Sequence, residues 1–193
     1  MTRPTWGVSG VVSSVTAMAM IAALLVLFGT PTRAVADEYD QIETAVQAKG
    51  QIQEGALLMR FPRTDVHVTV RGEPVLTALG FVSWTAWKNL GDNTLLVGEL
   101  VLLESEVNPV ITELEKAHIS VAALHNHFMW EKPRIMYLHI QGLGRGIEMA
   151  RGFKAALDKT TTPQGSRPHA PESPVSLDIR PIQDITGHLG VND

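Results

Sequence analysis

The sequence predicts an α+β domain in which an antiparallel sheet carries helices on one of its faces. Two segments, 121–127 and 135–140, are rich in β-branched, aromatic and aliphatic residues, and the Glu-Lys-Pro turn at 131–133 separates them. This pattern is typical of a hairpin. One amphipathic helix is expected before the hairpin and another after it. The order strand–helix–strand–strand–helix is that of a split β-α-β, or ferredoxin-like, arrangement.

Composition limits the classes of function that are open to this chain. The 193 residues are 45% hydrophobic and 19% charged, which fits one globular domain with additional segments. The formal net charge is −4 and the calculated pI is about 6.0, so no basic surface favours nucleic acid as a partner. Cysteine is absent, which excludes disulfides, thiolate metal sites and a lipidated N-terminal cysteine. Any metal ligand therefore has to be His, Asp or Glu.

The first 36 residues have the pattern of an export signal. Arg3 provides a positive start, residues 17–28 form an apolar run, and Ala34-Val35-Ala36 matches a small-x-small cleavage site. We expect cleavage after Ala36 and an exported protein, periplasmic or extracellular. The alternative is an uncleaved membrane anchor, because the apolar stretch that begins near Val11 approaches the length that spans a bilayer. Membrane contact is expected only through this signal segment, if it remains uncleaved.

Several strands and one helix are predicted between the signal and residue 103. Residues 37–48 have apolar positions near helical spacing, and Gly50 is positioned to cap the helix at its C-terminal end. Strands are predicted at 55–61, 66–70, 79–87 and 94–103, with Pro62 and the Gly-Asp-Asn turn at 91–93 as breaks. The strand at 94–103 is expected to be interrupted at Gly98-Glu99.

Two further helices flank the hairpin. The first is predicted to start close to Ser105, because this start places Pro109 in the first helical turn, where proline is tolerated. The second follows the hairpin and has an apolar stripe at helical spacing. The apolar positions of these two helices are Val107, Val110, Ile111 and Leu114, and Ile147, Ala150, Phe153, Ala156 and Leu157.

The chain changes in composition at Thr161. Residues 161–174 are rich in proline and polar side chains, which predicts a linker without a packed core. Beyond the linker, residues 179–190 can be aligned with residues 39–50, so that Ile182 falls on Ile42. This alignment predicts the start of a second copy of the module. We therefore expect a signal peptide at 1–36, an α+β domain at 37–160, and a linker with a truncated second module at 161–193.

Histidines of the hairpin form the best candidate site. Side chains alternate between the two faces of a strand, so His125 and His127 are expected on the same face. His139 joins them if the two strands pair at positions of equal parity. Imidazole is a common ligand of divalent metals, so these residues predict a metal site, with zinc as one possible ion. The alternative is that the histidines are satisfied polar residues at the end of a strand.

Glu99 is the candidate carboxylate ligand of this site. It lies inside an apolar strand, where an ionised group is costly unless it is paired or bound to a metal. The alternative is an edge or bulge position that is created by Gly98. Catalytic residues are not identified by any motif in the sequence.

Four motifs resemble the LppY/LpqO family of exported bacterial proteins. They are Gly-Glu-Leu-Val-Leu at 98–102, Glu-Val-Asn-Pro-Val at 106–110, Ala-Leu-His-Asn-His at 123–127 and Pro-Arg-Ile-Met-Tyr-Leu-His at 133–139. The resemblance covers residues 37–159 and implies an exported protein without an established activity. Members of the family usually carry two tandem modules, in agreement with the partial repeat in the tail. This chain lacks a lipobox cysteine, so lipid anchoring is not implied.

Two functions of different classes follow from these observations. The first is a secreted or cell-envelope binding or structural module, whose histidines bind a metal or small ligand without turnover and whose partner is a small ligand or envelope component. The second is a metal-assisted hydrolase that uses His125, His127 and Glu99, with a metal-bound water as nucleophile. Such an enzyme needs an acid beyond the ligands as general base. Glu131 is expected in a mobile turn, so the sequence favours binding.

Overall fold

The computed structural model describes residues 33–163 and 178–189. Most of the predicted signal and most of the predicted linker therefore lie outside the described residues. The predicted cleavage site, Ala34-Val35-Ala36, falls within a helix that begins at Arg33. No helix within the described ranges combines the length and the apolar character needed to cross a membrane.

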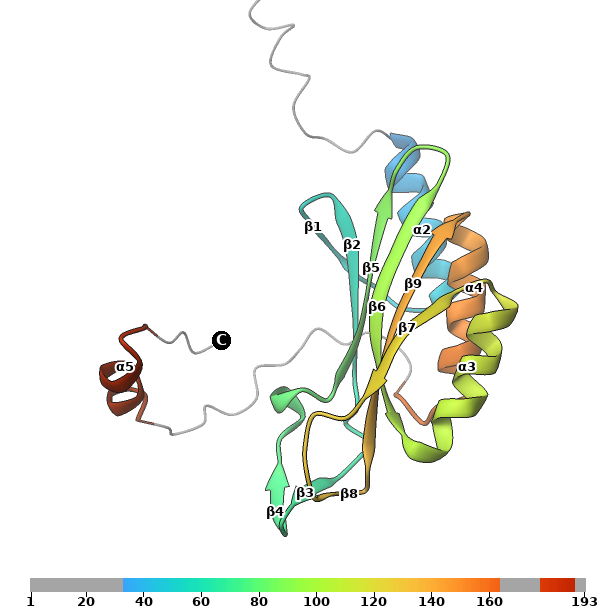
Figure 1. Ribbon diagram of the computed structural model, residues 1–193. Helices are drawn as coiled ribbons and strands as arrows, with labels where there is room; N and C mark the ends of the chain where they lie inside the picture. Colours follow the sequence, from blue (N-terminus) through green and yellow to red (C-terminus); the bar gives the residue numbers. More distant parts are fainter. Residues whose placement is uncertain (1–32, 164–177, 190–193) are drawn as a thin grey trace, which may run out of the picture. The chain divides into compact units, whose positions relative to one another are not determined.

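The described chain contains strands in several runs, with helices before, between and after them (Figure 1). In order they are α2 (Arg33–Val46), β1 (Gln51–Gln53), β2 (Ala56–Pro62), β3 (Val68–Val70), β4 (Glu73–Val75), the 3-10 helix η1 (Thr77–Leu79), β5 (Val82–Asn89), β6 (Thr94–Leu103), the 3-10 helix η2 (Glu104–Glu106), α3 (Val107–Lys116), β7 (Ser120–His125), β8 (Glu131–Lys132), β9 (Ile135–Gly144), α4 (Gly146–Leu157) and α5 (Arg180–Thr186). Pro109 lies in the first turn of α3, as predicted.

Six strands form the main sheet, in the order β1-β2-β5-β6-β9-β7. All neighbouring strands are antiparallel. Strands β6 and β7 are therefore parallel to each other, with β9 inserted between them and α3 as their connection. This is the split β-α-β unit that the sequence predicts. The hairpin partners β7 and β9 are also paired, with His125 opposite Tyr137.

Helices α2, α3 and α4 cover one face of the main sheet (Figure 1). Alternate residues of the strands point into this layer, because the side-chain period of a strand is two residues. Leu96, Leu100 and Leu102 of β6 are fully buried there, together with Phe153 of α4. The predicted antiparallel sheet with helices on one face is thus confirmed.

A second, smaller sheet covers part of the opposite face. Its strands are ordered β4-β3-β8, and Val68 of β3 packs against Val101 and Tyr137 of the main sheet in a second apolar cluster. Farther along the same face, Val97 is 37% exposed and Leu143 is 65% exposed. We call this uncovered part of the main sheet the open face.

Strand β6 is continuous, in contrast to the predicted interruption at Gly98-Glu99. Glu99 pairs with Trp84 on one side and with His139 on the other, so it occupies neither an edge nor a bulge. Gly98 has a different role. A Cβ at this position would lie 2.6 Å from the carbonyl oxygen of Trp84, so glycine permits the close approach of β5.

The end of α2 also differs from the prediction. The left-handed residue after the helix is Gln47, with φ of 60°, and Gly50 lies beyond the helix. Gly50 is required by a contact with β2 instead, because a Cβ there would lie 2.6 Å from the carbonyl oxygen of Leu58. A glycine that permits close packing and a glycine that caps a helix look the same in a sequence.

A buried arginine connects the sheet to the start of α3. Arg63 is fully buried, and its Nη1 donates hydrogen bonds to the carbonyl oxygen of Val101 (2.6 Å) and to Oε2 of Glu106 (2.8 Å). Nε and Nη2 donate to the two carboxylate oxygens of Asp65, each at 2.9 Å. Burial opposes ionisation of Asp65, but hydrogen bonds from Arg63 and Thr161 outweigh it and lower the pKa of this carboxyl.

The same network holds the chain after α4. The amide of Thr161 donates to Oε1 of Glu106 (2.9 Å), and its hydroxyl donates to Oδ2 of Asp65 (2.7 Å). Thr162 is buried. The first two residues of the predicted tail segment therefore pack against the domain.

Replacing Arg63 should be among the most destabilising single changes in the domain. Arg63→Met leaves Glu106 and Asp65 without their cation, and removal of one partner from a buried ion pair costs about 3–5 kcal/mol. The matched control is Lys116→Met, which breaks the exposed pair with Glu113 and should cost less than about 1 kcal/mol. Urea denaturation of both variants at pH 7 measures the difference. Equal losses would contradict a central role for Arg63.

Candidate metal centre

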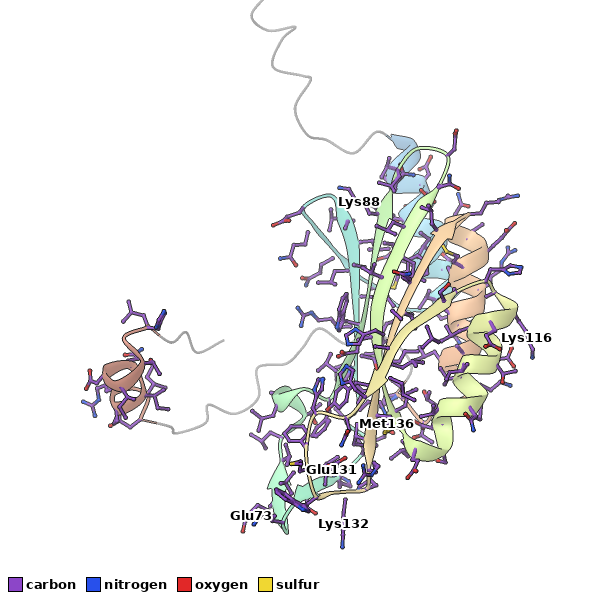
Figure 2. The ribbon with its side chains drawn as sticks, in the orientation of Figure 1. Glu73, Lys88, Lys116, Glu131, Lys132 and Met136 are labelled. Atoms are coloured by element: carbon purple, nitrogen blue, oxygen red, sulfur yellow. The ribbon has the colours of Figure 1, made fainter. Side chains whose placement is uncertain are left out.

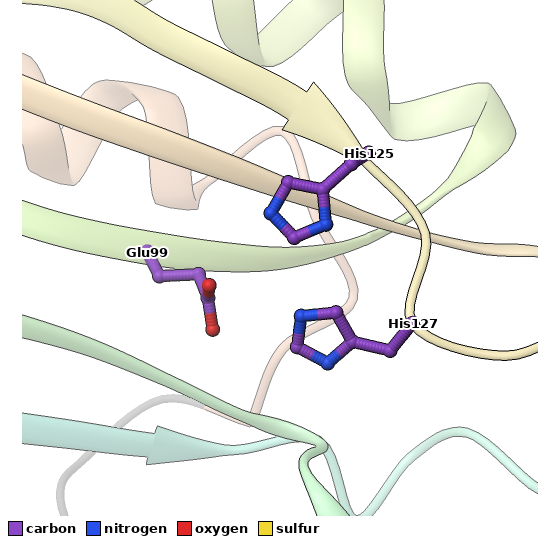
Figure 3. Close-up of side chains that lie close together, drawn as sticks. All are labelled: Glu99, His125 and His127. Carbon is purple, nitrogen blue, oxygen red and sulfur yellow. The ribbon is translucent and has the colours of Figure 1, made fainter.

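The structure brings the four predicted ligands together on the open face, at its border with the small sheet. Glu99 comes from β6, His139 from β9, and His125 from the last position of β7. His127 lies two residues beyond the end of β7, in the connection to β8. Figure 3 shows the rings of His125 and His127 and the carboxylate of Glu99 turned toward a common space.

Short distances connect the polar atoms of this cluster. Nε2 of His139 lies 2.9 Å from Nε2 of His125 and 3.1 Å from Oε2 of Glu99. One ligand atom from each of Glu99, His125 and His127 can be chosen so that all three lie within 4.8 Å of one another. Glu99, His125 and His127 thus form one compact group of possible ligands, and His139 lies beside it in contact with His125 and Glu99.

Strand register explains three of the four positions. Glu99 is directly opposite His139, and His139 is opposite Ala123 of β7. His125, two residues after Ala123, therefore faces the same side as His139. The condition for His139 to join His125 on one face, strand pairing at positions of equal parity, is therefore met.

Strand alternation does not explain the position of His127, because this residue lies beyond the end of β7. Its ring stacks on the ring of Tyr137, with centroids 3.4 Å apart and planes inclined by 11°. It also stacks on the ring of His125, at a centroid distance of 5.1 Å. Ring stacking thus holds His127 in the connection after β7. The expectation that His125 and His127 belong to one strand was wrong, because β7 ends at His125.

Gly80 lies beside this stack. Its φ of 123° lies in a region that residues with a side chain rarely adopt. A Cβ at this position would lie 3.7 Å from Nδ1 of His127 and 3.8 Å from the hydroxyl oxygen of Tyr137. The turn before β5 therefore lies directly beside the site.

The surroundings of His127 favour its neutral form. Burial is the largest cause of a lowered pKa for this imidazole, and the nearby His125 and His139 lower it further, against an opposing effect of Glu99. A neutral imidazole is the form that binds a metal. The environment of His127 therefore suits metal coordination near neutral pH.

Two further polar side chains are buried and do not belong to the predicted ligand set, Glu131 on β8 of the small sheet and Tyr137 on β9. Among the residues described, both carboxylate oxygens of Glu131 and the hydroxyl of Tyr137 are buried and have no hydrogen-bond partner. Burial, then Glu99, then Glu131 raise the pKa of Tyr137, so its phenol stays protonated. Tyr137 shares the parity of His139 along β9, and this is the signal that could have identified it.

The expectation that Glu131 lies in a mobile turn was wrong. Glu131 belongs to β8, pairs with Val70 of β3, and is only 5% exposed. It lies next to Lys132 on the small sheet (Figure 2). The segment between β7 and β9 is thus a structured part of the domain and carries a buried carboxylate.

Metal-free protein should lose stability as the pH falls through the histidine range, and His127→Gln should reduce this loss. The pKa of His127 is lower in the folded chain than its ordinary value of about 6.5, so protons bind preferentially to the unfolded chain. The free energy of unfolding is highest above pH 6.5 and decreases as the pH falls below it. Urea midpoints between pH 7.5 and 5, with a chelator present, measure the slope.

The control for this experiment is His118→Asn. His118 is exposed after α3, and its φ of 56° suits asparagine. This variant should retain the slope of the wild type. Parallel slopes for wild type and His127→Gln would contradict the assigned environment of His127.

Comparison with known proteins gives one family match. The family model described as Domain of Unknown Function (DUF1259) matches residues 40–159, which is more than half of the chain and includes all four residues of the cluster. No curated protein and no solved structure matches the sequence significantly. The description does not carry the LppY/LpqO name, so that resemblance stays a prediction. The chain belongs to the DUF1259 family.

Proposed function

We propose that this chain is an exported binding module of the cell envelope that holds a divalent transition-metal ion between Glu99, His125, His127 and His139. The observation that supports this most directly is the 2.9 Å distance between the Nε2 atoms of His125 and His139, with the Glu99 carboxylate 3.1 Å away from the latter. Polar atoms of this kind, gathered on one sheet face, match the donor set of a metal site.

The dimensions of the cluster suit a small cation. Zinc binds imidazole nitrogen and carboxylate oxygen at about 2.0–2.2 Å, so two ligand atoms on one tetrahedral ion lie roughly 3.3 Å apart. The contacts of 2.9 and 3.1 Å, and the 4.8 Å limit for Glu99, His125 and His127, bracket this value. Small side-chain shifts are enough to close the cluster around an ion.

Ligand chemistry selects the class of metal. Imidazole suits zinc, nickel, copper and iron, whereas magnesium and calcium prefer oxygen ligands throughout. The His139 side chain is 40% exposed and that of Glu99 is 13% exposed. An ion can therefore reach the cluster from solvent while the fold stays intact.

A second function is supported by one specific observation. Metal-assisted hydrolysis with His125, His127 and Glu99 requires an acid that is not itself a ligand. Glu131 is a buried carboxylate whose two oxygens have no partner among the described residues. It is the candidate for this role, and binding without turnover remains the first proposal because no substrate-binding group is identified beside Glu131.

Removing His127 should weaken metal binding far more than it changes the fold. His127→Ala deletes one of four ligands, so the loss of zinc affinity should exceed the roughly 10–100-fold that loss of an outer-shell partner causes. Titration of zinc, nickel and manganese into chelator-treated protein, with melting followed in parallel, measures both effects. Affinity of the wild type should decrease as the pH falls below about 6.5, because bound imidazoles must be neutral.

His118→Asn is the control for this titration as well. It removes an exposed histidine that follows the helix α3, on the opposite side of the sheet from the cluster. This variant should bind metal like the wild type. Equal metal response in wild type and His127→Ala would refute the site and would leave the histidines as structural residues.

Export is proposed from the N-terminal pattern, and mass spectrometry tests it. The positive start, apolar run and Ala-Val-Ala site predict a mature chain that begins at Asp37. The intact mass of protein recovered from outside the cytoplasmic membrane should correspond to residues 37–193. Recovery of the full-length chain from the membrane fraction would instead support an anchor.

A further inference from the structure

A row of side chains extends from the metal centre across the open face. The strand register pairs Glu99 of β6 with Trp84 of β5, and Trp84 with Arg60 of β2. Directly opposite residues of antiparallel strands direct their side chains to the same face. Trp84 and Arg60 therefore lie on the same side of the sheet as Glu99 and His139.

Within the described residues, neither of these two side chains has a partner in a ring contact, a hydrogen bond or an ion pair. Trp84 is partly exposed, and its indole makes no contact with another aromatic ring within the described residues. Arg60 is exposed, and nothing in residues 33–163 or 178–189 forms a hydrogen bond or ion pair with its guanidinium. Lys88 of the same face differs, because its Nζ donates a hydrogen bond to the carbonyl oxygen of Glu54 at 3.0 Å.

The neighbouring row provides an apolar floor. It lies two residues along each strand from Arg60, Trp84 and Glu99, on the same face. Its members, successive partners in the register, are Leu58, Ala86 and Val97. Val97 is 37% exposed. A flat apolar ring placed over Trp84 would remove part of this apolar surface from water. This burial favours a ligand with a ring over a flexible, fully hydrated ligand.

We propose that this row binds an organic dianion that contains one flat ring. The inference rests on the proposed metal centre, where one anionic group coordinates the ion. The ring lies over Trp84, and the second anionic group pairs with Arg60. Adjacent strands are about 4.8 Å apart, so the backbones at Arg60 and Glu99 are separated by roughly 10 Å. This span suits a single ring with a carboxylate at each end.

Charge complementarity is the argument for this occupant. A bound divalent ion and a free guanidinium form two positive ends of the row, and a dianion satisfies both. Arginine recognises carboxylates through two parallel hydrogen bonds, which gives the far end of the site directional specificity. The aromatic surface between the two positive ends distinguishes this ligand from a simple inorganic anion.

Calorimetric titration of terephthalate and benzoate into the zinc-loaded full chain tests the proposal. These probes differ in one carboxylate, so terephthalate should bind roughly tenfold more tightly in the wild type. Arg60→Gln should abolish this difference while it leaves benzoate binding and zinc affinity unchanged. Trp84→Leu should weaken binding of both probes, and Lys88→Gln, the matched control, should change neither.

The outcomes separate this inference from the proposed function. Zinc binding by the wild type with equal affinities for the two probes, or with unchanged terephthalate affinity in Arg60→Gln, would overturn the inference alone. Failure of the wild type to bind zinc would overturn the proposed function and the inference with it. A dimer in sedimentation experiments that excludes terephthalate would assign the open face to a second copy of the chain, and would also overturn the inference.

Discussion

The unbroken pairing of β6 with β9 is the constraint on which the domain depends. All ten residues from Thr94 to Leu103 have a partner on β9, without a shift in register. This register sends Leu100 into the layer beneath the helices and Glu99 to the opposite face. A slip by one residue would exchange the two faces, placing a carboxylate in the core and a leucine beside the histidines. The apolar core therefore enforces the geometry of the polar cluster.

Three carboxylates near the core differ in the hydrogen-bond and ion-pair partners of their oxygens. Glu106 accepts hydrogen bonds from Arg63, from the amide of Leu103 and from the amide of Thr161, so both of its oxygens have donors. Glu99 contacts an imidazole at the boundary with solvent, and Glu131 is buried without a partner among the residues described. The first arrangement stabilises a corner of the fold. The other two carboxylates have no such set of donors among the described residues.

Local periodicity explains why much of the fold could be predicted from the sequence. Strand β6, the helices around it and the split β-α-β order all follow from patterns within short segments. The shared face of His125 and His139 required only the parity of one hairpin. The small sheet could not be found in this way, because β8 has two residues and pairs with β3, about sixty positions earlier in the chain. Glu131 takes its place in the fold through that long-range pairing.

The structural role of a glycine depends on which atoms pack against it, and two glycines were therefore predicted wrongly. Gly98 and Gly50 suggested a bulge and a helix cap, yet each permits contact with a neighbouring backbone carbonyl. A sequence shows the missing side chain but does not show the atom that takes its place.

Glu99, His125 and His139 lie on three adjacent strands of one sheet, and this has a consequence for kinetics. The hydrophobic core already orders these three ligands when the chain folds, so binding of an ion requires little additional ordering. Zinc-finger peptides behave differently, since they are unfolded without their metal. An ion bound at the proposed site would therefore be exchanged while the domain remains folded.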